Sequence, residues 1–175
     1  VLGPVRLSAH EGLSVKVPER HLRLLLASLV AAEGDPVSAD ALIDRLWGEE
    51  QPSNPKKVLR AKLSRLRTVL DQSHPGARER LTYTSAGYRL EVSPHEVDAR
   101  RFKDAVDRAR EMVSAREKVE TLQTALGLWR GEPYGDAVDE TWLMSTIAEL
   151  QDLRGNALES LVETLLDQGE PGRAL

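Results

Sequence analysis

A leucine-spaced basic segment over residues 53–70, SNPKKVLRAKLSRLRTVL, constrains the fold of this chain more than any other stretch. At 100° per residue its leucines share one narrow stripe, which is typical of a helix with one buried face. These leucines are Leu59, Leu63, Leu66 and Leu70. Ser53 is the predicted N-cap of this helix, because its hydroxyl can accept a hydrogen bond from the first turn.

The charge of the same segment points to a partner. It contains six Lys and Arg residues and no acid, whereas a solvated surface helix usually mixes both signs. We therefore predict a helix with a core side and a cationic side that favours a polyanionic partner. A merely solvated basic face is the alternative that this segment alone leaves open.

Short strand and helix patterns surround the basic segment. Alternating apolar residues predict two strands within residues 1–17, with a turn at His10-Glu11-Gly12. Apolar residues at helical spacing predict helices over 19–32 and 39–47, the second capped by Ser38. After a polar loop over 71–80, the strand-like runs 81–84 and 88–92 predict a hairpin. This order is that of a winged helix-turn-helix, whose second helix enters the major groove of DNA.

A second, helical region follows a break at Ser93-Pro94-His95. Apolar spacing predicts an antiparallel helix pair from residue 97 to Trp129, with Met112 and Val113 on the apolar face of its first helix. It then predicts one long helix, or two abutting helices, over 139–168. Residues 1–93 carry 14 Lys and Arg against 11 Asp and Glu, whereas residues 94–175 carry 10 against 17. A basic half followed by an acidic half suggests a different partner for each.

The composition argues against several other classes. The 175 residues include no Cys, and the four His residues lack ligand spacing, so no metal and no cofactor is expected. No glycine-rich phosphate loop and no nucleophile paired with a base is recognisable, so we expect no enzyme. No apolar run approaches the ~18 residues of a membrane helix. We expect a cytoplasmic bacterial protein without a membrane partner.

Several motifs resemble one known family. RHLRLLLASLV, PVSADALIDRLWGEEQPSN, VLRAKLSRLR and GYRLEV resemble the OmpR-type winged helix of the Streptomyces antibiotic regulatory protein (SARP) family. VDARRF and ALGLWRGEPY resemble that family's bacterial transcriptional activation domain. The resemblance covers nearly the whole chain in the family's order. It implies a mainly α fold with small β: an OmpR-type winged helix-turn-helix over 1–93, then an all-α tetratricopeptide-like domain over 94–175, truncated at its C-terminus.

The resemblance also implies a function. A member of this family would be a sequence-specific DNA-binding activator that binds direct repeats near a promoter, self-associates on DNA, and recruits RNA polymerase holoenzyme with its sigma factor to antibiotic-biosynthesis genes. Direct repeats require head-to-tail protomers instead of a two-fold dimer. Two alternatives stay open: a helical-repeat module that binds protein, and the N-terminal part of a larger regulator containing an ATPase.

The cationic side of the basic helix supplies the predicted DNA contacts. The outward positions predicted to read bases are Lys57, Arg60, Ala61 and Ser64. Arg60 is the foremost, because Arg bidentate to guanine is the commonest specific contact. Flanking cations are expected to meet phosphates, which give affinity and register but no sequence preference; they are Lys56, Lys62, Arg65 and Arg67. Pairing with acids of its own domain is the alternative for Arg65 or Arg67.

Three further predictions concern residues outside the basic helix. The resemblance places Arg23 of the first helix as a phosphate contact. The hairpin residues Tyr83, Thr84 and Arg89 are also expected to reach phosphates, although the tip lacks the Arg or Pro that relatives often carry. The resemblance further matches the loop residues Glu49 and Glu50 to a loop that can face RNA polymerase in OmpR-type relatives; a plain exposed loop is the alternative.

Overall fold

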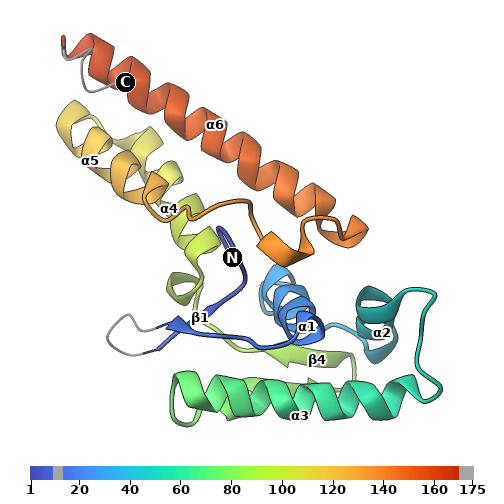
Figure 1. Cartoon of the computed structure of the whole chain (residues 1–175). Coiled ribbons are helices and arrows are strands. Elements are labelled where there is room, and N and C mark those ends of the chain that lie inside the picture. Colours follow the sequence, from blue (N-terminus) through green and yellow to red (C-terminus); the bar gives the residue numbers. More distant parts are fainter. Residues whose placement is uncertain (10–13, 170–175) are drawn as a thin grey trace.

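A computed structural model describes residues 1–9 and 14–169 (Figure 1). The first half contains two short strand pairs and three helices: β1 (Leu7–Ser8), β2 (Ser14–Val15), α1 (Arg20–Ala31), α2 (Ala39–Trp47), α3 (Pro55–Ser73), β3 (Leu81–Thr84) and β4 (Gly87–Leu90). The second half contains three helices: α4 (Asp98–Glu111), α5 (Ala115–Leu126) and α6 (Met144–Asp167). Single 3-10 turns join them: η2 (Ala77–Arg80), η3 (Pro94–Glu96), η4 (Gly135–Ala137) and η5 (Thr141–Leu143). The predicted class, mainly α with small β, is confirmed.

The core of the first half forms where α1 packs against both α2 and α3. All four leucines of the predicted stripe on α3 are buried. Leucines of α1 and α2 meet them, among them Leu22, Leu25 and Leu42, each 0% exposed. Ser38 caps α2 as predicted, since its hydroxyl accepts a hydrogen bond from the Ala41 amide at 3.1 Å. α3 is therefore held along the outside of the molecule, at the lower edge of Figure 1.

The ends of α3 differ from the prediction. Its N-cap is Asn54 instead of Ser53, because the Asn54 side-chain oxygen accepts a hydrogen bond from the Lys57 amide at 3.1 Å. At the other end the helix continues past Leu70 to Ser73, through polar residues that the apolar period does not mark. The polar loop predicted over 71–80 is therefore wrong, and most of that stretch is helical or belongs to η2.

The hairpin forms a small wing beside α3. Its register pairs Leu81 with Leu90 and Tyr83 with Tyr88, so the second strand begins and ends earlier than predicted. Val37, just before α2, bridges Tyr88 through two backbone hydrogen bonds of 2.8 and 2.9 Å. Gly87 has φ +138°, and a Cβ there would lie 2.2 Å from the Val37 carbonyl oxygen. Only glycine fits this point, where the wing docks on the helical core.

The strand prediction for residues 1–17 holds only in part. β1 and β2 pair over two residues each. In the part of the chain that the structure describes, residues 1–6 belong to no strand. Leu2 and Val5 are nevertheless buried. The predicted turn at His10-Glu11-Gly12 lies outside the described residues.

In the second half α5 packs against both α4 and α6, and α6 also contacts α4 (Figure 1). Of the two alternatives for residues 139–168, one continuous helix is correct, although α6 begins only at Met144, after η5. Met112 and Val113 follow the end of α4, and Val113 is fully exposed, so the prediction of an inward Val113 is wrong. Among the described residues no helix combines the length and apolarity that crossing a membrane requires.

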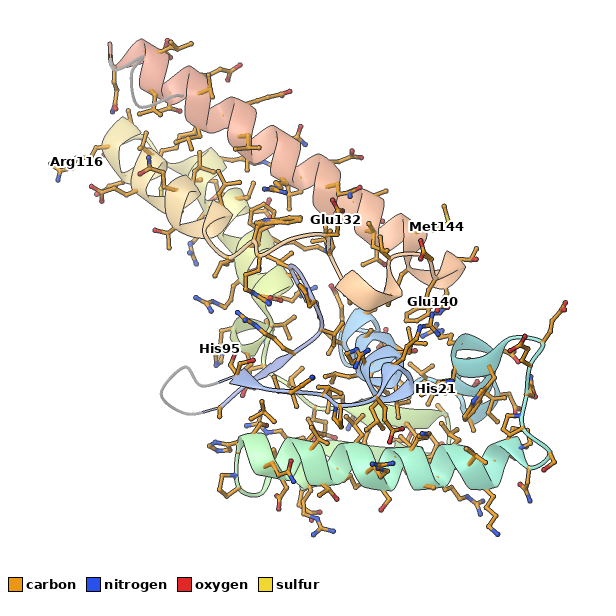
Figure 2. All side chains as sticks on the ribbon, in the orientation of Figure 1. His21, His95, Arg116, Glu132, Glu140 and Met144 are labelled. Carbon is orange, nitrogen blue, oxygen red and sulfur yellow. The ribbon has the colours of Figure 1, made fainter. Side chains whose placement is uncertain are left out.

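The two halves touch over several elements. Arg20 of α1 pairs with Glu140 at 2.6 Å, and Arg45 of α2 lies over the Trp142 ring at 4.9 Å. Figure 2 shows Glu140 and Met144 at the end of α6 that lies nearest to α1 and α2. The division of the chain into domains 1–93 and 94–175 stays a prediction.

Candidate nucleic-acid interface

The outward face of α3 gathers the residues predicted to read bases. Lys57, Arg60, Ala61 and Ser64 are all exposed, on the side opposite the buried leucines. Neither Lys57 nor Arg60 forms an ion pair with any residue of the described part of the chain. Two uncompensated cations beside two small side chains form a surface that can approach a polyanion closely.

The start of α3 is fixed by its cap and by a proline. Asn54 satisfies the Lys57 amide, and Pro55 at the first helical position has no amide to leave unsatisfied. Lys56 lies 3.5 Å from Asp40 of α2, and both side chains are mostly exposed, so this contact is weak. Lys57 and Arg60 therefore project from the first two turns of α3, whose start is fixed by its N-cap.

Glu19, the residue before α1, contacts two of the flanking cations. Its carboxylate pairs with Lys62 and with Arg65, through a different oxygen in each case. The hydrogen bond from Lys62 is the main cause that holds the pKa of Glu19 below its ordinary value of 4.5. Lys62 is 20% exposed and Arg65 is 61% exposed, so solvent reaches the pair from the Arg65 side. From the sequence, an acid partner was the alternative for Arg65 or Arg67, and neither Glu19 nor the pairing of Lys62 was identified.

The remaining predicted phosphate contacts of the helices hold the backbone of the same domain. Arg67 donates from Nη2 and Nε to the Leu81 carbonyl, at 2.8 and 3.2 Å, which ties α3 to the wing. Arg23 donates to the carbonyls of Val17 and Pro18, at 3.0 and 3.2 Å, and so fixes the entry into α1. Both side chains are half-buried. Their contact with phosphate stays a prediction.

The wing exposes the aromatic side chain of Tyr83 to solvent. Tyr83 is 67% exposed, with its ring centroid 4.9 Å from that of Tyr88. The Thr84 hydroxyl donates to the Gly87 carbonyl at 3.2 Å and accepts from the Ala86 amide, which shapes the tip. Arg89 pairs with Glu91, and this hydrogen bond is the main cause that lowers the pKa of Glu91. The wing is therefore ordered by its own side chains before any partner binds.

The loop between α2 and α3 exposes Glu49 and Glu50. Two contacts hold it: Gln51 donates to Asp44 at 3.1 Å, and the Glu50 amide donates to the Trp47 carbonyl at 2.9 Å. This acidic loop lies at the N-terminal end of α3 (Figure 1). No group of His, Asp and Glu in the described part of the chain could hold a metal ion.

Two family models match the chain, one on each side of the break near residue 93. Residues 14–90 match "Transcriptional regulatory protein, C terminal", and residues 97–175 match "Bacterial transcriptional activator domain". The chain is 32% identical to the transcriptional regulator RedD of Streptomyces coelicolor, over all of this chain and 51% of RedD. It is 31% identical to the regulatory protein DnrI of Streptomyces peucetius, over 97% of this chain and 65% of DnrI. The chain belongs to the SARP family.

The SARP membership confirms the resemblance seen in the sequence. A solved structure agrees: Mycobacterium tuberculosis EmbR, in complex with a low-affinity phosphopeptide, superposes with a TM-score of 0.86 at 28% identity. The match covers 97% of this chain and 45% of EmbR. The SARP chain thus spans about half the length of RedD and of EmbR.

Proposed function

We propose that this SARP-family chain is a sequence-specific DNA-binding transcriptional activator whose α3 enters the major groove. The observation that carries the proposal is the outward face of α3, where Lys57 and Arg60 lie exposed and unpaired within the described chain. A major groove admits one α-helix, and its outward side chains then meet base edges. Ala61 and Ser64 are small enough to let the helix approach.

In this proposal the base contacts and phosphate contacts come from different parts of the surface. Lys57, Arg60, Ala61 and Ser64 read bases. The phosphate contacts come from α3, from the start of α1 and from the wing: Lys56, Lys62, Arg65, Arg67, Arg23, Tyr83, Thr84 and Arg89. Neutralising about six phosphates gives a log–log salt slope of roughly −5 by counterion release.

The partners of the whole regulator belong to the same proposal. Protomers bind direct repeats head to tail near a promoter, in the bacterial cytoplasm, and contact RNA polymerase holoenzyme and its sigma factor. The exposed pair Glu49 and Glu50 supports a polymerase contact at the loop between α2 and α3. The relatives RedD and DnrI are named as regulators, which supports a regulatory protein without enzymatic activity of its own. That the regulated genes are antibiotic-biosynthesis genes is what membership of the antibiotic regulatory protein family implies.

An in-vitro selection from random duplex DNA at near-physiological salt tests the proposal. The expected result is a short motif repeated at about one helical turn, ~10 base pairs. Recovery of no motif, with binding that vanishes as salt rises, would reduce the interaction to charge attraction. That outcome would favour the alternative, a helical-repeat module that binds protein.

A further inference from the structure

The residue before α1 places a negative charge on the side of α3 that is proposed to face DNA. Glu19 Oε2 pairs with the Lys62 ammonium, and Glu19 Oε1 pairs with the Arg65 guanidinium. One carboxylate is thus shared by two cations, and the three groups together carry a net charge of +1. Glu19 is 30% exposed, so the group is accessible from solvent.

A DNA phosphate would need the same donors. Lys and Arg bind phosphate through the N–H groups that here point at Glu19, and the carboxylate repels an approaching phosphate. The charge of Glu19 is secure at neutral pH, because the Lys62 hydrogen bond keeps its pKa below the ordinary value. The residues proposed to read bases do not take part in this cluster: Lys57 and Arg60 form no ion pair within the described residues.

We propose that Glu19 is an internal competitor for the phosphate contacts of Lys62 and Arg65, and that it lowers affinity for DNA of any sequence. This inference rests on the proposed DNA-binding function. Binding to random DNA depends almost wholly on phosphates, and a genome offers a vast excess of random sites. Glu19 therefore limits the general affinity of the surface, whereas Lys57 and Arg60 determine which sequence is preferred.

The variant Glu19→Gln tests the inference because it removes the charge and keeps the shape. One additional effective positive charge steepens the log–log salt slope by about 0.9. If the natural chain and the variant bind equally at 1 M salt, this difference in slope makes the variant bind about eightfold tighter at 0.1 M salt. Titrations of the natural chain and the variant with a selected duplex and with a random duplex measure both quantities. We expect the gain to be the same on both duplexes.

Two controls separate the local effect from general charge. Glu163→Gln changes the net charge equally but lies exposed on α6, and we expect it to bind DNA like the natural chain. In a background of Lys62→Ala and Arg65→Ala, Glu19→Gln should add less affinity than in the natural chain, because no cation is freed and only the direct repulsion between the carboxylate and phosphate is removed. Circular dichroism of each variant checks that the helices are intact.

The outcomes distinguish this inference from the proposed function. Unchanged or weaker binding by Glu19→Gln, with an unchanged salt slope, overturns the competitor role and makes Glu19 a residue that positions the two cations. An equal gain from Glu163→Gln also overturns it. Failure of the natural chain and of Glu19→Gln to bind either duplex at low salt overturns the DNA-binding proposal instead.

Discussion

The two long helices α3 and α6 use the same packing but opposite surface charge. α3 has 19 residues and α6 has 24, and each buries five positions along one face. The exposed side of α3 is cationic as far as Leu70, whereas the exposed acids of α6 include Glu149, Asp152, Glu159 and Glu163. The comparison teaches that the apolar period places a helix in the fold, and that the opposite face determines the chemistry of its partner.

Removing a buried leucine from α3 should have the largest effect. Leu63 is 1% exposed, so Leu63→Ala leaves a cavity among α1, α2 and α3, and we expect a loss of about 2–5 kcal/mol in the free energy of unfolding. Urea denaturation followed by circular dichroism measures it. Ser64→Ala, one position along on the exposed face, is the control and should stay within about 0.5 kcal/mol. Equal stability of the two variants would contradict the assignment of faces.

Removing a cation from the outward face of α3 should affect binding and leave folding intact. We expect Arg60→Ala to cost about 1–3 kcal/mol of binding to the selected duplex and to relax the preference at one base position. Competition titrations with singly substituted duplexes measure this. Arg154→Ala, which removes a cation from α6 where it lies over Trp129, is the matched control and should not change binding. Equal losses on selected and random DNA would exclude a base contact by Arg60.

A flanking cation should contribute less than Arg60 and without sequence preference. Arg65→Ala is expected to weaken binding to all duplexes alike, by a few-fold, and to flatten the salt slope by at most about 0.9. The effect is limited because Arg65 already shares the Glu19 carboxylate. Titrations at several salt concentrations measure the slope. Unchanged binding would rule out a phosphate contact by Arg65.

The smallest expected effect is a pH dependence of stability from His21, whose ring centroid lies 5.7 Å from that of Trp47. Burial is the main cause that lowers the pKa of His21 below 6.5, with Lys62 and Arg20 adding to it and Glu19 opposing it. The unfolded chain therefore takes up this proton at higher pH than the folded chain does. The free energy of unfolding should fall as the pH drops from 6.5 toward the pKa of His21 in the folded chain. Above pH 6.5 His21 is neutral in both states and should not lower it. Denaturation midpoints between about pH 5 and 8 should show a weaker dependence for His21→Gln.

The sequence predicted the faces of α3 well, because leucine spacing fixes both the helix and its orientation. It also predicted the Ser38 cap, which depends on residues three positions apart. The partner of Lys62 and Arg65 was beyond reach, since Glu19 lies more than 40 positions earlier in the chain. The end of α3 was missed because its last residues, Asp71 to Ser73, are polar and continue the helix without extending the apolar period.

The first residues of the chain pack on its second half. The Leu2 carbonyl accepts a hydrogen bond from the Arg130 amide, and the Val1 carbonyl accepts one from the Tyr134 amide, both at 2.7 Å. At Gly3, a Cβ would lie 2.9 Å from the Arg130 Cβ. A chimaera can join the DNA-binding half of one regulator to the helical half of another at residue 93. Residues 1–5 would then come from one regulator, and the helical half that they contact would come from the other. Exchanging specificities between relatives requires that residues 1–5 remain with the helical half that they contact.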